Sequence, residues 1–157
     1  SPDAVDMWWL APWYVADDGD SARREALWHL TSLVHHWARI GVDARFPADL
    51  RDGILELGSR YHLRTHGEPT DEEKAAYAEL AQQLGVADHL LRRFTFSGTP
   101  AEVSRQMIAA RQAGAENLDC ANPAPRGRVL ERPRAFYEKV LPLLDPQAVG
   151  TGHGRAE

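Results

Sequence analysis

The stretch FSGTPAEV, residues 96–103, marks the point where a short strand gives way to a helix. Thr99 occupies an N-cap position, Pro100 the first helical position and Glu102 the third, which is the spacing of a capping box. In that motif the threonine hydroxyl and the glutamate carboxylate each bind the other residue's backbone N–H. The sequence therefore predicts a strand over residues 94–96 and a helix that starts at Pro100.

Two more segments are typical of strands. VDMWWLAPWYV, residues 5–15, is a continuous apolar run, too short for an ordinary helix, with Pro12 as a bend or unpaired position. AENLDCA, residues 115–121, follows the helix that Gly114 ends. Because helices of crossover length separate the strands, we expect parallel pairing with right-handed connections.

The longest helix is predicted over residues 21–40, with Asp20 as its N-cap and Gly41 as its stop. Its apolar residues recur at spacings of three and four, so one side should face a core. These residues are Ala26, Leu30, Leu33, Trp37 and Ile40, flanked by Leu27 and Val34.

Residues 42–92 are predicted to form a helical insertion between the first and second strands. It contains helices at 48–57, 71–84 and 86–92, and a capping box of Thr70 and Glu73 opens the second of them. A final helix is expected over 134–144, followed by a disordered tail at 145–157.

Composition excludes several classes of protein. Apolar residues make up 43% of the 157 positions and charged residues 26%, the balance of a globular chain. The net charge of -5 offers no clustered basic face, so nucleic acid is not expected as a partner. No apolar run reaches the roughly 20 residues that span a bilayer, so no membrane association is expected. Cys120 is the single cysteine, which fits a reducing compartment and predicts a cytoplasmic protein.

Three motifs resemble the luciferase-like monooxygenase family. VADDGDSAR, residues 15–23, is similar to the end of that family's sixth strand, and FSGTPAEV to its seventh strand and helix cap. QAGAENL, residues 112–118, resembles the approach to the eighth strand, before a helix that ends in VLPLL at 140–144. The resemblance covers roughly residues 5–144.

The resemblance implies an α/β fold consisting of the last three strand-helix units of a (βα)8 TIM-type barrel, incomplete in this chain. It implies a cofactor, either FMN or a deazaflavin (coenzyme F-420), and a small-molecule substrate. Since three strands cannot close a barrel, a second chain or fragment, or another copy of this chain, should cover the exposed edge. The chain begins without an initiating Met and is interpreted as processed or excerpted.

Five residues are candidates for cofactor contacts at the ends of the strands. Trp13 and Tyr14 lie where such barrels have their active sites, although core packing explains them equally well. Ser97, Gly98 and Thr99 lie at a helix N-terminus, which favours an anion, although capping requires the same residue types.

Asn122, after the third strand, is a further candidate for cofactor contact. No catalytic residue is identified. No metal site is predicted, because the adjacent His35 and His36 point about 100° apart on a helix. His62 and His66 have metal-ligand spacing but no carboxylate partner.

Three functions are compatible with these patterns. The first is part of a luciferase-like flavin or deazaflavin oxidoreductase that forms one wall of the pocket. The second is a non-catalytic dimerisation scaffold derived from that barrel. The third is a self-contained α/β binding domain with Trp8, Trp9 and Trp13 in its core.

Overall fold

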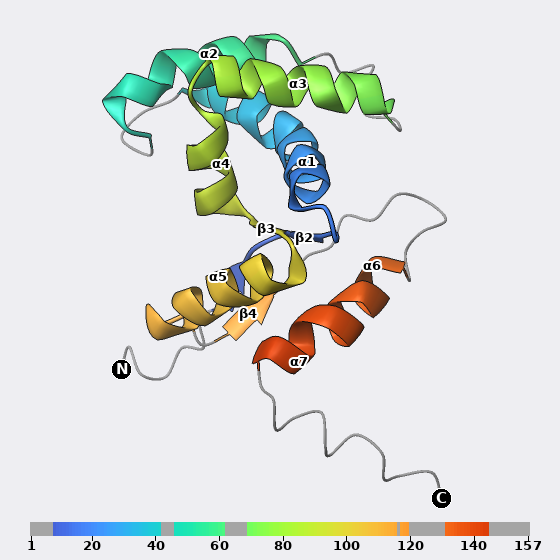
Figure 1. Ribbon diagram of the computed structural model, residues 1–157. Helices are drawn as coiled ribbons and strands as arrows, with labels where there is room; N and C mark the ends of the chain where they lie inside the picture. The colour runs from blue at the N-terminus through green and yellow to red at the C-terminus, as the bar shows by residue number, and fades with distance from the viewer. Residues whose placement is uncertain (1–7, 42–45, 62–68, 116, 120–130, 145–157) are drawn as a thin grey trace, which may run out of the picture. The chain divides into compact units, whose positions relative to one another are not determined.

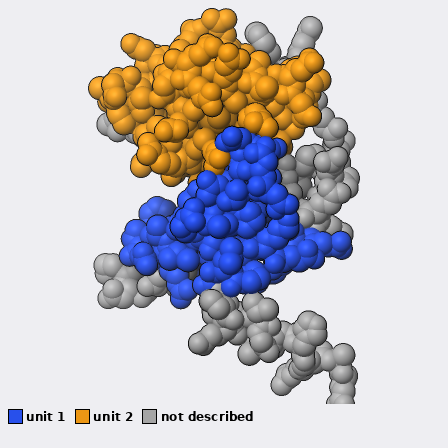
Figure 2. Space-filling view, viewed as in Figure 1, with its two compact units in different colours: residues 1–22, 96–157 blue, residues 23–95 orange. Residues whose placement is uncertain are grey.

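The computed structural model describes residues 8–41, 46–61, 69–115, 117–119 and 131–144. The chain is mixed α/β and mostly helical, with small sheets (Figure 1). It divides into two compact units, coloured separately in Figure 2. We call residues 1–22 with 96–157 the strand unit and residues 23–95 the helical unit.

The strand unit holds all four described strands, joined in two parallel pairs. Strand β2 pairs with β3, and β1 pairs with β4, so the predicted parallel pairing is confirmed. The elements are β1 (Trp8–Leu10), β2 (Trp13–Val15), β3 (Phe96–Gly98), α5 (Pro100–Gln112), β4 (Asn117–Asp119), α6 (Glu131–Ala135), a π-helical turn (Phe136–Val140) and α7 (Leu141–Leu144).

The strand predicted over residues 5–15 is interrupted within its described part. Pro12 separates β1 from β2, and its carbonyl accepts the N–H of Phe96 at 3.0 Å. The third predicted strand, β4, pairs with β1, whereas a barrel segment would place it beside β3. Among the described strands, the first and second predicted strands are neighbours as in a barrel, and the expected pairing of β4 with β3 is absent.

The core of the strand unit lies between β2, β3, α5 and the π-helical turn. Trp13, Val103, Met107 and Val140 are its buried members. The ring centroids of Trp13 and Phe136 are 4.8 Å apart. Trp8 and Trp9 are 66% and 51% exposed, so the prediction of a core built from three tryptophans is wrong for both.

The final helix changes its winding before Pro142. Leu141 donates its N–H to the carbonyl of Phe136, five residues back. Pro142 has no N–H to continue an α-helical ladder, which gives a physical reason for a wider turn just before it. The helix also begins at Glu131, three residues before the predicted start.

In its described residues, the helical unit contains four α-helices around one core. They are α1 (Gly19–Ile40), whose first turn belongs to the strand unit, α2 (Arg51–Ser59) after a 3-10 turn at Ala48–Leu50, α3 (Asp71–Gln83) and α4 (Ala87–Phe94). The buried core residues are Leu27, Leu30, Val34, Phe46, Ile54, Leu57, Tyr77, Ala78, Ala81, Val86, Ala87 and Leu90. This unit runs from Arg23, inside α1, to Thr95.

Two predictions for α1 need correction. The N-cap is Asp18, not Asp20, because the Asp18 carboxylate accepts the N–H groups of Asp20 and Ser21. Leu33 and Ile40, assigned to the core-facing stripe, are 38% and 55% exposed. The buried face is centred on residues 26, 27, 30 and 34 instead.

Within the described ranges, no helix combines the length and the apolar character needed to cross a membrane. The predicted tail at 145–157 lies outside the described residues, as do Asn122 and Cys120.

Candidate functional site

The carboxyl ends of β2 and β3 bring three of the predicted site residues together. Tyr14 is the register partner of Ser97, and Val15 is that of Gly98. Side chains alternate between the two faces of a strand. Since Trp13 and Val15 pack on the helix-facing core, Tyr14 and Ser97 belong to the opposite face.

Trp13 is explained by core packing. It is 4% exposed and packs with Val103, Met107 and the ring of Phe136. Tyr14 is 2% exposed and Ser97 4% exposed, so this pair forms a buried polar position on the face opposite the Trp13 core. Of the two aromatic candidates, only Tyr14 therefore lies outside the Trp13 core.

The backbone of Ser97 is held by a side chain that the sequence analysis missed. Gln106 on α5 accepts the Ser97 N–H through Oε1 at 3.0 Å. Its Nε2 donates to the Ser97 carbonyl, also at 3.0 Å. This two-point contact fixes the end of β3 against α5. No short-range motif signals a contact across nine residues, and only the packing of helix against strand reveals it.

Gly98 has a backbone conformation that suits glycine, with φ +140°. A Cβ built there would lie 2.5 Å from Oε2 of Glu102 and 3.0 Å from its Cβ. Gly98 therefore lets the chain turn from β3 into α5 without displacing the capping glutamate.

The predicted capping box at Thr99 is present. The Thr99 N–H donates to Glu102 Oε2 at 2.7 Å, and the Glu102 N–H donates to Thr99 Oγ1 at 3.4 Å. Pro100 has no N–H to offer. These contacts place a carboxylate at the N-terminus of α5, which opposes an anionic ligand there. The capping interpretation of Thr99 accounts for its contacts.

An ion pair joins the loop after β2 to the final helical segment. Lys139 Nζ lies 2.7 Å from Asp17 Oδ1 and 2.9 Å from Oδ2. Both side chains are substantially exposed, so the pair is worth little stability by itself. It places a cation and a carboxylate near the carboxyl end of β2. Because Asp17 and Lys139 are far apart in the sequence, no motif predicted this ion pair.

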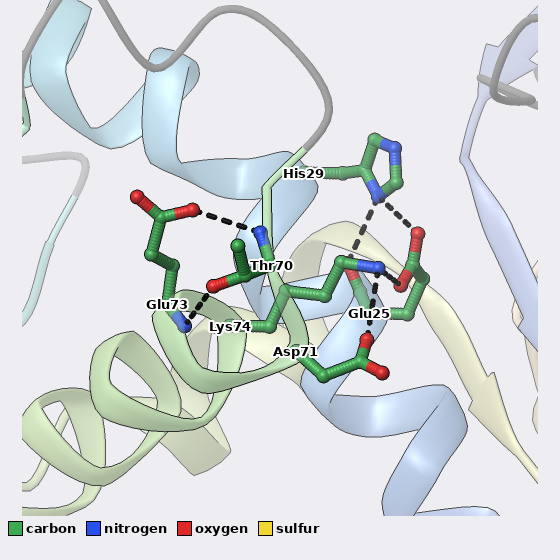
Figure 3. A network of polar contacts seen from close by, with 6 residues as sticks. All are labelled: Glu25, His29, Thr70, Asp71, Glu73 and Lys74. Carbon is green, nitrogen blue, oxygen red and sulfur yellow. Dashed lines mark hydrogen bonds and ion pairs between the residues drawn. The ribbon is translucent and has the colours of Figure 1, made fainter.

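Figure 3 shows a second polar network, which lies in the helical unit and ties α1 to the first turn of α3. Lys74 Nζ contacts Glu25 Oε2 at 2.7 Å, and His29 Nδ1 lies 3.5 Å from Glu25 Oε1. Beside it, the predicted capping box of Thr70 and Glu73 is present. The network explains how the two helices are held together and contains no nucleophile paired with a base.

Comparison of the chain with protein-family models, with curated proteins and with solved structures gave no match. Among the described residues, no group of three or more metal-ligating side chains lies close enough to hold a metal ion. The site is thus defined by its fold and geometry alone, as the carboxyl edge of a parallel strand pair in a mixed α/β chain.

Proposed function

We propose that this chain is the carboxyl-terminal part of a luciferase-like flavin or deazaflavin oxidoreductase of the cytoplasm, forming one wall of the cofactor and substrate pocket. The observation that carries the proposal is the pair of Tyr14 and Ser97 at the carboxyl ends of adjacent parallel strands. Ligands of α/β enzymes bind at that end of the strands, where loops and polar side chains converge.

The chemistry would come from the cofactor, which carries the hydride or oxygen step when bound. The contribution of this chain would be placement and exclusion of water. Tyr14 and Ser97 would form part of the pocket wall, because both are polar and they are neighbours near the carboxyl ends of β2 and β3. The phosphate of the cofactor would bind elsewhere, since the Glu102 carboxylate occupies the α5 N-terminus.

The proposal includes a partner that covers β1. Trp8, Trp9 and Leu10 are 66%, 51% and 69% exposed, and three consecutive large apolar side chains favour burial against other protein. The partner we propose is a second chain or fragment that supplies the rest of the barrel.

The test combines the intact mass of every polypeptide in the native preparation with its absorption spectrum. We expect a second polypeptide together with a flavin-like or deazaflavin-like band. Ser97→Ala should reduce the amount of cofactor retained, whereas Ser104→Ala, a matched buried serine on α5, should not. A single colourless polypeptide that binds neither FMN nor a deazaflavin would contradict the proposal.

The same exposed strand favours a second candidate, a non-catalytic scaffold that dimerises through β1. Sedimentation of the purified chain separates the two. A cofactor-free dimer that Trp9→Ser converts to monomer would support the scaffold. Because Trp9 is 51% exposed, this substitution should change the free energy of unfolding of the monomer by less than about 0.5 kcal/mol.

A further inference from the structure

The helical unit contains an open pocket of about 260 Å³ that the proposed function does not use. Its walls include the aromatic rings of Trp28 on α1, Tyr77 on α3 and Tyr61 just after α2, together with Leu80. The rings of Trp28 and Tyr77 meet edge to face with centroids 6.0 Å apart. Aromatic walls of this kind accept a flat ring by stacking or edge contacts.

The volume limits the size of the ligand. A cavity of about 150 Å³ holds one benzene ring, whereas drug-sized ligands need about 300–1,000 Å³. The pocket of the helical unit lies between these values. It therefore suits one ring system with a short side chain.

The phenol groups in the wall stay uncharged at neutral pH. Burial raises the pKa of Tyr77, and the neighbouring Tyr61 raises it further. Burial also raises the pKa of Tyr61. The aromatic wall is thus neutral, and the charge of the pocket comes from the two ionic side chains that line it.

Those two side chains, Arg60 and Glu73, carry opposite charges, and each has one polar atom without a contact among the described residues. Arg60 binds Glu56 Oε1 through Nε and Nη2, at 2.8 and 2.6 Å, which leaves Nη1 without a contact among the described residues. Glu73 Oε2 accepts the Thr70 N–H at 2.8 Å, and Oε1 has no contact among those residues. A cation and a carboxylate therefore line the same aromatic pocket.

We propose that this pocket binds a small aromatic zwitterion, a flat ring whose short side chain carries both an ammonium and a carboxylate group. Arg60 would pair with the carboxylate and Glu73 with the ammonium group. A ligand with one charge would pair with one of these residues and be repelled by the other. This inference is independent of the oxidoreductase proposal, because every residue involved lies in the helical unit.

The test is a ligand-observed NMR titration of the full chain with three probes that share an indole ring. L-tryptophan is the zwitterion, indole-3-propionate the anion and tryptamine the cation. We expect L-tryptophan to bind about fivefold more tightly than either of the others, the gain of one additional exposed ion pair. Equal affinities for the three probes, or no saturable binding of L-tryptophan, would overturn the proposal.

Substitutions locate the binding. Ala76→Trp fills the pocket from α3 and should weaken the binding of L-tryptophan about tenfold or more. Ala75→Trp lies one residue away and outside the pocket lining, so it should leave the binding of L-tryptophan unchanged. Unchanged binding of L-tryptophan to the Ala76→Trp variant would show that the ligand does not bind in this pocket. Far-UV circular dichroism of both variants establishes that α3 is intact.

Charge substitutions test the chemical class without filling the pocket. Glu73→Gln keeps an acceptor for the capping box and should remove the preference for L-tryptophan over indole-3-propionate. Glu72→Gln, a carboxylate in the same helical turn but outside the pocket lining, is the matched control. Arg60→Gln should remove the preference for L-tryptophan over tryptamine. Because the Arg60 side chain is exposed, this substitution should leave the fold intact. Preferences that survive both pocket substitutions would overturn the proposal.

Discussion

The two units differ in how they bury their apolar side chains. The helical unit encloses twelve described residues in one core, whereas the core of the strand unit has four. The strand unit also exposes Trp8, Trp9 and Leu10 on β1. A helix satisfies its backbone internally and needs cover only for one stripe. A strand needs a neighbour at each edge and a layer on its apolar faces. The helical unit therefore buries its apolar stripes in its own core, whereas the strand unit leaves β1 uncovered within the described residues.

The largest expected effect is a cavity in the helical core. Leu90 is fully buried, so Leu90→Ala should lower the free energy of unfolding by about 2–5 kcal/mol. Urea denaturation followed by circular dichroism measures the change, because most of the helix signal comes from this unit. If Leu90→Ala lowered the free energy of unfolding no more than Trp9→Ser does, the proposed difference in burial between the two units would be wrong.

The next effect concerns the turn into α5 in the strand unit. Gly98→Ala should cost about 1–3 kcal/mol, because alanine is strained at φ +140° and its Cβ would displace the capping Glu102. Gly114→Ala is the matched control, with φ +98° and no atom near the added Cβ. Equal losses for the two variants would show that backbone strain alone matters and that the contact with Glu102 does not.

Two matching capping boxes allow the units to be compared directly. Thr70→Ala in the helical unit and Thr99→Ala in the strand unit should each cost about 1 kcal/mol. Hydrogen exchange of α3 and α5 measures each loss locally. Because the boxes lie in different units, we expect the losses to add in the double variant. A strong departure from additivity would show that the two units are energetically coupled.

The smallest effect is a pH dependence within the helical unit. Burial lowers the pKa of His89 below 6.5, and the charges of Arg93 and Arg92 lower it further. The carboxylate of Asp49 acts in the opposite direction but does not reverse the shift.

Because the unfolded imidazole binds a proton more readily than the folded one, the stability present above pH 6.5 is lost progressively as the pH falls from 6.5 through the lower pKa of folded His89. His89→Phe, which keeps a ring beside Phe46 and Phe94, should remove that part of the pH dependence. Thermal unfolding of both proteins between pH 7.5 and 5.5 measures it. Parallel losses in the two proteins would contradict the assignment to His89.

Local rules predicted the starts of α3 and α5 correctly. Thr99, Pro100 and Glu102 specify the start of α5 through hydrogen bonds within four residues, and the structure contains them. The same holds for Thr70 and Glu73 at α3. The predictions were wrong where packing between elements determines which face of a helix is buried. In α1, the stripe was placed too far toward Leu33 and Ile40, because spacings of three and four fit more than one face of a long helix.

The sequence by itself therefore determined the caps of α3 and α5, the parallel strands and the mixed α/β class, since these depend on contacts between near neighbours and on connection length. Tertiary structure alone decided that β4 pairs with β1, that Gln106 holds Ser97 and that Arg60 and Glu73 line one pocket. Such pairings join residues from separate elements. Their energies depend on how the elements pack in three dimensions, which no local pattern of residues encodes.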